Sequence, residues 1–184
     1  MAIHRNERNT RIMSLFTILA THEFLIPANL SLIAYFLFIR RRSWFSIRIA
    51  SIALSSLGLM FWLKHLFKRK RPSDPLLKAR GLSFPSGHAF MSSTFYGLLI
   101  YIAWQNIKNV WLKWIGIISL AFLVLAIGLS RVYLRVHYAS DVIAGYCVGC
   151  MWLLLSLWVL GKMEKFSRKK VDPIVEENPS YVGK

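Results

Sequence analysis

The sequence predicts an all-α protein that crosses a membrane several times. Hydrophobic residues make up 55% of the 184 positions, a share that is high for a soluble domain, and they gather in long runs. A transmembrane helix needs about 20 predominantly apolar residues, a length that several of these runs approach. No strand-like alternation of any length interrupts them. We therefore expect a polytopic transmembrane helical bundle with five spans.

The N-terminal region, residues 1–23, is expected to form a basic segment at the membrane interface. Three arginines precede an apolar run at 12–20 that is too short to cross a bilayer. The first span is expected over 24–39. Its helix should begin near Phe24, because the ring of Pro27 would clash with the carbonyl of the residue four positions earlier.

The second span is expected over 44–66, with Trp44 suited to the membrane interface. A basic stretch follows it, and Pro72 disfavours helical backbone at the residue before it. We therefore expect the helix to stop at about Arg71. Residues 72–87 should form a loop, since they contain three prolines and two glycines.

Three further spans are expected over 88–104, 114–130 and 138–161. Two of them carry small residues at every fourth position, which marks closely packed helix faces: Ala89, Ser93 and Gly97 in the first, Gly145 and Gly149 in the last. The remaining residues, 162–184, are expected to form a basic, disordered tail. The chain thus divides into the segment 1–23, a transmembrane domain over 24–161 and this tail.

The charges between the spans predict an orientation. Alternating spans place the 67–87 loop and the 130–138 turn at one membrane face, and the 40–48 loop, the 105–113 loop and the C-terminus at the other. By the positive-inside rule the second face is cytoplasmic, because it carries a long series of cations: Arg40, Arg41, Arg42, Arg48, Lys108, Lys113, Lys162, Lys165, Arg168, Lys169 and Lys170. The first face is therefore expected to lie outside, together with the N-terminus.

The segment Pro85-Ser86-Gly87-His88 joins the long loop to the third span. Ser86 is placed to cap the helix, and Gly87 lets the backbone approach a ligand closely. The free N–H groups of the first helical turn attract an anion. His88 has a side chain suited to acid–base chemistry near neutral pH. An ordinary helix start is the alternative, and the tetrapeptide alone does not exclude it.

Two further groups of residues are candidates to form one site together with this segment. Lys64 and Arg71 are seven residues apart, so they share a face if the helix continues that far. Asp141 lies one helical turn after His137, so its carboxylate can accept the imidazole Nδ1–H and leave Nε2 free to attack. Snorkelling cations and a structural His–Asp pair are the alternatives. An acidic residue at a membrane boundary, in a chain with only 8 acidic residues, favours function.

A metal or redox site is not expected. No third carboxylate or Cys accompanies the histidines, and Cys147 and Cys150 lie in an apolar run without a second ligand pair. We predict no metal and no cofactor. A nucleic-acid partner is also not expected, because the cations lie at span ends rather than on one continuous face.

The spacing of these residues resembles a known three-part signature. Lys64-x6-Arg71-Pro72, Pro85-Ser86-Gly87-His88 and Ser130-Arg131-x5-His137-x3-Asp141 are similar, in order and spacing, to the signature of the type 2 phosphatidic acid phosphatase superfamily. That superfamily includes membrane lipid phosphatases, soluble acid phosphatases and vanadium haloperoxidases. The resemblance covers residues 64–145 directly, and the surrounding spans are similar to the compact bacterial members. Those members usually have six spans, which implies that the first is absent here or that 1–23 lies along the surface.

The resemblance implies a role for each signature residue. His137 would be the nucleophile that forms a phosphohistidine, Asp141 would orient it, and His88 would protonate the leaving alcohol and then activate water. The phosphate oxygens would be held by five residues: Lys64, Arg71, Ser86, Gly87 and Arg131.

The leading hypothesis is a metal-independent integral-membrane lipid phosphatase that hydrolyses a lipid phosphate monoester or diphosphate. A vanadate-dependent haloperoxidase and a non-catalytic phospholipid-binding membrane protein are the alternatives. The expected location is the inner membrane of a bacterial cell, with the site facing the periplasm or outside. The substrate stays open among phosphatidic acid, phosphatidylglycerophosphate, undecaprenyl diphosphate and lipid A phosphates. Lys78 and Arg80 in the loop would either favour a second phosphate or face lipid headgroups. The residues single out no oligomeric state.

Overall fold

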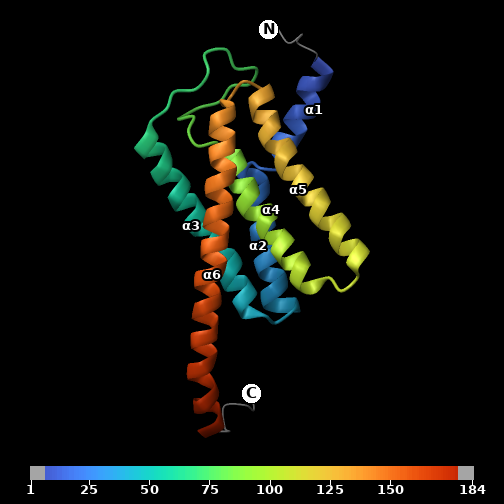
Figure 1. Ribbon diagram of the computed structural model, residues 1–184, viewed down its shortest axis with the longest axis vertical. Helices are drawn as coiled ribbons and strands as arrows, with labels where there is room; N and C mark the ends of the chain where they lie inside the picture. The colour runs from blue at the N-terminus through green and yellow to red at the C-terminus, as the bar shows by residue number, and fades with distance from the viewer. Residues whose placement is uncertain (1–6, 178–184) are drawn as a thin grey trace.

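The computed structural model describes the backbone of residues 7–177 and side chains as far as residue 169. Over this range the chain is helical and contains no strand, which confirms the predicted fold class (Figure 1). The elements are α1 (Glu7–Ile18), α2 (His22–Ala34), the π-helical turn η1 (Tyr35–Ile39), α3 (Ser43–Phe67), α4 (Gly87–Asn106), α5 (Val110–Tyr133) and α6 (Ala139–Glu177).

The N-terminal region differs from the prediction of an interfacial segment over 1–23. Residues 7–18 form α1, which packs against α5 within the bundle. A short break separates α1 from α2, and Ala20 within it and Leu25 after it are buried in one apolar cluster. The two helices and η1 therefore form one apolar stretch, Glu7–Ile39, that is long enough to cross a membrane.

The start of α2 is also earlier than expected. The helix begins at His22, two residues before Phe24, and Pro27 lies inside it. A proline has no N–H, so it removes the hydrogen bond to residue 23. Glu23 lies in the first turn and is exposed, where its carbonyl can be hydrated, and this makes the proline tolerable.

Helix α3 ends earlier than expected, at Phe67 rather than about Arg71. Lys68 adopts left-handed backbone with φ 47°, which stops the helix. Lys64 and Arg71 therefore do not share a helix face. They approach each other because the loop folds back over the end of α3. Lys64 Nζ donates to the carbonyl of Leu82 at 2.8 Å, and Arg71 Nε donates to that of Gly81 at 3.1 Å.

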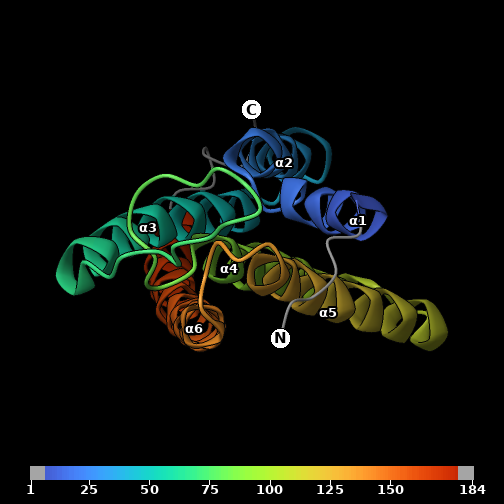
Figure 2. The same ribbon diagram turned by 90° about the horizontal axis from the view of Figure 1, so that it is seen from above.

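Helix α4 occupies the centre of the bundle, with the other helices around it (Figure 2). The small-residue faces predicted for this helix and for α6 pack against each other. A Cβ built on Gly145 would lie 2.8 Å from the backbone oxygen of Ser86, and one built on Gly149 would collide with the hydroxyl of Ser93. Only glycine allows the two backbones to approach this closely.

Four stretches are long and apolar enough to cross a membrane: Glu7–Ile39, Ser43–Phe67, Val110–Tyr133 and Ala139–Lys169. The remaining predicted span, α4, is less apolar because it contains Ser92, Ser93 and Thr94, and all three of these residues are buried. Large apolar side chains on the outer helices stay exposed, among them Phe38, Leu54, Phe122 and Leu154. In a membrane these side chains face lipid, and the protein is an integral membrane protein.

Helix α6 extends beyond its predicted end at 161 and reaches Glu177. The disorder predicted for 162–184 is therefore wrong as far as residue 177, and 178–184 lie outside the described residues. The segment is rich in strong helix formers, and Glu164 accepts from Arg168 one turn later at 3.0 Å. These local preferences, together with the ion pair between Glu164 and Arg48, favour helix beyond residue 161.

The two ends of the bundle differ in character (Figure 1). One end carries α1, the long loop after α3 and the α5–α6 turn. The other carries the α2–α3 and α4–α5 turns, beyond which α6 projects. This alternation is the one expected from the spans, and it brings the predicted site residues to one end.

Candidate active site

The predicted site residues come from four helices, one loop and one turn, which meet at one end of the bundle. Lys64 lies near the end of α3, Arg71 in the following loop, and Ser86, Gly87 and His88 at the start of α4. Arg131 lies in the last turn of α5 and Asp141 in the first turn of α6, with His137 in the turn between them. His137 interacts electrostatically with Lys64, Arg71, Arg131 and Asp141, and His88 interacts with the same three cations and with His137. Gly87 is beside Lys64, since a Cβ built on the glycine would lie 3.9 Å from Lys64 Cε.

Asp141 is fully buried and is held by several donors. Arg69 Nη1 donates to Oδ1 at 2.8 Å, Ser83 Oγ donates to Oδ2 at 2.5 Å, and the backbone N–H of Tyr138 donates to Oδ2 at 3.0 Å. These three hydrogen bonds fix the carboxyl group in place, and one of them comes from a guanidinium group.

His137 lies beside this carboxylate and is 3% exposed. Its Nδ1 is 3.5 Å from Asp141 Oδ2 and 3.4 Å from Ser83 Oγ. Its Nε2 is 3.2 Å from Arg71 Nη1. A guanidinium can only donate, so Nε2 is the acceptor and the ring proton is on Nδ1. In this tautomer the ring's lone pair is on Nε2, where it accepts from Arg71.

The surroundings keep His137 neutral. Burial lowers the pKa of His137, and the positive charges of Arg71, Arg131 and Lys64 lower it further, while Asp141 opposes them. Burial also lowers the pKa of Arg71, an effect that Asp141 opposes. The imidazole is therefore unprotonated around neutral pH, which is the form a nucleophile requires.

Carbonyl groups of the loop and of the α5–α6 turn accept from Lys64 and Arg71, the two cations of the first motif. Arg71 donates through Nη2 to the carbonyl of Arg80 and through Nη1 to that of Val136, at 3.1 and 2.8 Å. Asp74 pairs with Arg135 at 2.8 Å, which ties the loop to the α5–α6 turn. The loop therefore forms part of the site wall. The side chains of Lys78 and Arg80 are exposed.

Arg131 reaches the site from α5 and is 6% exposed. Its Nη1 donates to Thr17 Oγ1 at 3.1 Å, and that hydroxyl is also 3.1 Å from Ser130 Oγ. The contact brings α1 into the support of the site, a role that the apolar run at 12–20 did not suggest.

Unsatisfied buried polar atoms concentrate in the site. Among the described residues, five side-chain nitrogen or oxygen atoms are buried without a hydrogen-bond partner, and three of them are Ser86 Oγ, His88 Nε2 and Arg131 Nε. Ser86 is the N-cap residue of α4, but its hydroxyl makes no capping hydrogen bond, contrary to our expectation. A buried polar atom without a hydrogen-bond partner destabilises the folded protein unless a ligand pairs with it. The arrangement fits an oxyanion that accepts from a hydroxyl, a guanidinium and the first turn of α4.

Sequence reasoning missed Arg69, Ser83 and Thr17. Arg69 lay within a run of four cations, where nothing distinguished it from a headgroup contact. Ser83 lies two residues before the Pro85 motif, and Thr17 lies in an apolar run. Each acts through a contact between segments distant in the chain, which no local pattern reveals.

Side chains that could bind a metal ion do not cluster in the described part of the chain. No group of three or more His, Cys, Asp or Glu residues that could hold a metal ion occurs there. Cys147 and Cys150 are free and exposed on the outer side of α6.

The order of these residues and the helical bundle that presents them match one family. The model of the PAP2 superfamily matches residues 44–165. The chain belongs to the PAP2 superfamily. It is therefore a phosphoric ester hydrolase, built as an integral membrane protein.

Relatives and a solved structure agree with this assignment. The chain is 32% identical over 160 residues to phosphatidylglycerophosphatase B of Bacillus subtilis (strain 168), covering 85% of this chain and 76% of that protein. It is 33% identical over 110 residues to dolichyldiphosphatase of Saccharomyces cerevisiae, covering 54% of this chain and 45% of that one. The crystal structure of the transmembrane PAP2 type phosphatidylglycerolphosphate phosphatase from Bacillus subtilis superimposes with a TM-score of 0.78 at 25% identity, covering 87% of this chain and 80% of that one. The family predicted from the three motifs is confirmed.

Proposed function

We propose that this PAP2 protein removes phosphate from a membrane lipid through a phosphohistidine at His137, without a metal ion. One observation carries the proposal. The acceptor nitrogen of a buried, neutral His137 lies beside Arg71, among residues whose buried polar atoms lack partners. These residues, Ser86, His88 and Arg131, offer the donors that a phosphate would need.

In the first step the lone pair of His137 Nε2 attacks phosphorus, and the bond from phosphorus to the lipid oxygen breaks. His88 gives a proton to that oxygen, so the lipid leaves as an alcohol. In the second step His88 takes a proton from water, whose oxygen attacks phosphorus as the phosphorus–nitrogen bond breaks. Phosphate leaves, and both histidines return to their starting states. Asp141 orients the ring through Nδ1 and stabilises the positive charge that forms on it.

Fixed positive charge replaces a metal ion in this scheme. Lys64, Arg71 and Arg131 surround the position of the phosphate, and the N–H groups that begin α4 add to them. Donors that are already in place need no reorganisation when charge develops in the transition state. Phosphate binding also brings negative charge to a cationic site, which favours the protonated form of His88 that the first step requires.

The proposed substrate is a lipid phosphate monoester, with phosphatidylglycerophosphate as the first choice. The Bacillus subtilis relative that carries this activity in its name aligns over most of the chain. The exposed apolar sides of the helices let an acyl chain stay in the bilayer while its headgroup reaches the end of the bundle. The exposed Lys78 and Arg80 favour a diphosphate as the second candidate, because they would add positive charge at the loop that borders the site.

The proposed location is the inner membrane of a bacterial cell, with the site facing outward. The opposite end of the bundle carries Arg40, Arg41 and Arg42 in the α2–α3 turn and further cations near the start of α5 and along α6. Positive charge of this kind favours the cytoplasmic face.

Phosphate release from detergent-solubilised lipids tests the proposal. We expect release from phosphatidylglycerophosphate that EDTA leaves unchanged and orthovanadate abolishes. Phosphatidic acid, undecaprenyl diphosphate and lipid A phosphates should be cleaved more slowly. Loss of activity with EDTA would refute metal independence. Binding of the lipids without release would refute the enzyme assignment.

A further inference from the structure

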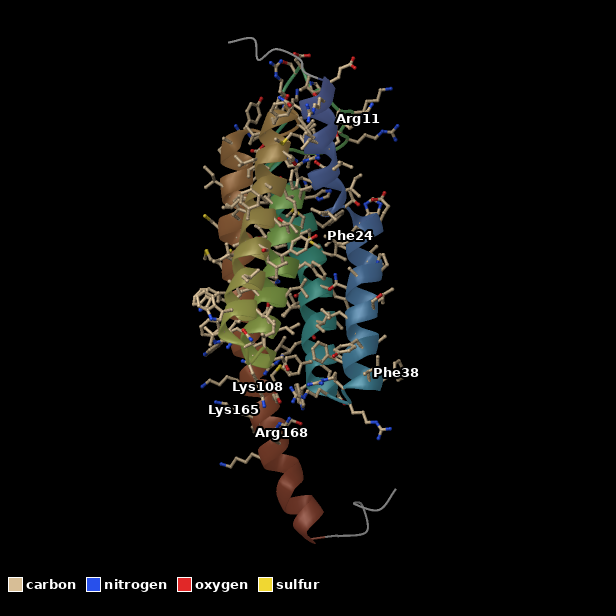
Figure 3. All side chains as sticks on the ribbon, turned by 90° about the vertical axis from the view of Figure 1, so that its right-hand side faces the viewer. Arg11, Phe24, Phe38, Lys108, Lys165 and Arg168 are labelled. Carbon is tan, nitrogen blue, oxygen red and sulfur yellow. The ribbon has the colours of Figure 1, made fainter. Side chains whose placement is uncertain are left out.

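A second group of arginines lies at the end of the molecule opposite the active site. Figure 3 shows Lys108, Lys165 and Arg168 toward this end and Arg11 toward the other. The α2–α3 turn, which contains Arg41 and Arg42, is at the end from which α6 projects (Figure 1), and Arg168 lines the same cavity as these two arginines. These residues have no part in the proposed catalytic steps.

The arginines line a cavity between the α2–α3 turn and α6. The cavity has a volume of about 460 Å³ and is bounded by Arg41, Arg42, Trp44, Glu164 and Arg168, together with Ser43 and Phe45. Its size is sufficient for a lipid headgroup and its first ester linkages, since small-molecule sites start at about 300 Å³.

The cavity is strongly positive, because its one carboxylate, that of Glu164, is already paired with two other arginine side chains. Glu164 Oε2 accepts from Arg48 Nη2 at 2.6 Å, and Oε1 accepts from Arg168 Nη2 at 3.0 Å. Within residues 7–169, neither Arg41 nor Arg42 forms an ion pair with a carboxylate. Two guanidinium groups are therefore available to an anion.

Several contacts hold this arrangement in place. Arg42 Nη1 donates to Asn106 Oδ1 at 3.1 Å, and its guanidinium lies 5.9 Å from the centre of the Phe45 ring. At the cavity wall the Arg48 and Glu164 side chains form an ion pair in which they are only 12% and 18% exposed, and Arg48 also donates to Tyr101. Withdrawing most of two charged side chains from water has a desolvation cost. Setting membrane orientation requires only cations near the surface, so it does not account for this largely buried pair.

The surroundings of the cavity favour a lipid over a free ion. Phe38 and Ile39, just before the turn, are 73% and 72% exposed, and Figure 3 shows Phe38 near this end. In a membrane these side chains lie among acyl chains. Trp44 lines the cavity and belongs to the residue type that prefers the membrane interface.

We propose that this cavity binds the phosphate headgroup of an anionic phospholipid at the membrane face opposite the active site. Arg41 and Arg42 contact the phosphate oxygens, and the acyl chains extend along Phe38 and Ile39. Basic pockets between transmembrane helices recognise anionic lipids in this way. The proposal does not depend on the catalytic scheme, and it concerns a site that the substrate does not occupy.

Native mass spectrometry of the full chain in detergent tests this proposal, with phosphatidylglycerol and phosphatidylcholine as probes. We expect one phosphatidylglycerol to be retained per chain, and less phosphatidylcholine. The double variant Arg41→Gln/Arg42→Gln should weaken phosphatidylglycerol binding about tenfold or more, because it removes two charge-assisted contacts. The matched control, Lys108→Gln/Lys113→Gln, removes the same charge from the same end but outside the cavity. It should leave binding unchanged.

Three results would overturn the proposal. Equal weakening in both double variants would show that the general charge of this end attracts the lipid. Loss of binding in Arg71→Gln would place the lipid in the active site instead. Retention of inorganic phosphate but not of phosphatidylglycerol would identify a free-ion site. Unchanged thermal unfolding of each variant in the same detergent verifies that the comparison is between folded proteins.

Discussion

The support of Asp141 by Ser83 gives the sharpest prediction for a residue outside the three motifs. Ser83 is fully buried, and its hydroxyl donates to Asp141 Oδ2 at 2.5 Å. The change Ser83→Ala removes this donor and a group 3.4 Å from His137 Nδ1. Ser56→Ala is a matched control, because the Ser56 hydroxyl is equally buried but has no hydrogen-bond partner among the described residues.

The expected magnitude follows from the type of bond. A hydrogen bond to a charged group contributes about 1.5–3 kcal/mol, and each 1.4 kcal/mol lost from the transition state slows the reaction about tenfold. We therefore expect Ser83→Ala to lower kcat by about 10- to 100-fold with little change in KM. Asp141 retains Arg69 and the backbone N–H of Tyr138 as donors, so the loss should be smaller than for Asp141→Ala. Ser56→Ala removes an unsatisfied hydroxyl and should leave kcat unchanged.

The assay is phosphate release in detergent micelles, run beside thermal unfolding of the same preparations. A Ser83→Ala enzyme with kcat within about twofold of wild type would refute the assigned role, because the bond would then contribute less than about 0.5 kcal/mol to the reaction. The reasoning would also fail if Ser56→Ala lowered kcat as much. In that case burial in the bundle, rather than contact with Asp141, would explain both effects.

Three further predictions concern packing, charge and protonation. Gly145→Ala should destabilise the protein by about 1–3 kcal/mol through overpacking against the start of α4, whereas Gly116→Ala, with no atom within 4 Å of the added carbon, should be neutral or stabilising in thermal unfolding. Arg69→Gln should lower kcat about tenfold or more by leaving Asp141 Oδ1 without its charged donor, and Arg69→Lys should restore part of the loss; equal activity in the two variants would contradict a charge effect. The ring of His137 should stay neutral from about pH 7 to about pH 5 in NMR of labelled histidine, because its pKa is lowered, with the His137→Gln spectrum identifying the signal. Since the unfolded chain takes up that proton first, this group's contribution to stability should decline as pH falls below about 6.5; a signal that titrates near pH 6.5 would refute the lowered pKa.

Much of the fold could be predicted because membrane spans leave a strong local pattern. Each predicted span coincides with a helix, and four of the five lie in stretches long and apolar enough to cross a membrane, with α4 as the exception. The spacing of Gly145 and Gly149 identified the face of α6 that packs on α4. Two errors have a common cause. The run at 12–20 is too short to cross a membrane alone, so it was assigned to the membrane interface rather than to the bundle. The basic segment after 161 has no apolar face, so it was assigned to a disordered tail rather than to a helix. The continuation of α1 into α2 depends on neighbouring helices, and the extension of α6 depends on backbone hydrogen bonds. A hydropathy pattern contains neither kind of information.

The site was predictable where its residues share a spacing along the chain. His137 and Asp141 are one helical turn apart, and the structure brings them together with Asp141 at the start of α6. The residues that support them were not predictable. Arg69 and Asp141 are far apart in sequence, and Thr17 and Arg131 are farther. Such contacts arise only when α1, the loop and the α5–α6 turn meet at one end of the bundle.

The most direct test of the central claim is the capture of a covalent phosphoenzyme. The purified enzyme is mixed with ³²P-labelled lipid phosphate, quenched with alkali within the first turnover and digested, and the labelled peptide is identified by mass spectrometry. We predict an acid-labile label on His137. His88→Ala should accumulate it with an activated leaving group, because the second step lacks its base, and His137→Ala should show no label and no turnover. A label on another residue, or turnover by His137→Ala, would contradict the assignment of His137 as the nucleophile.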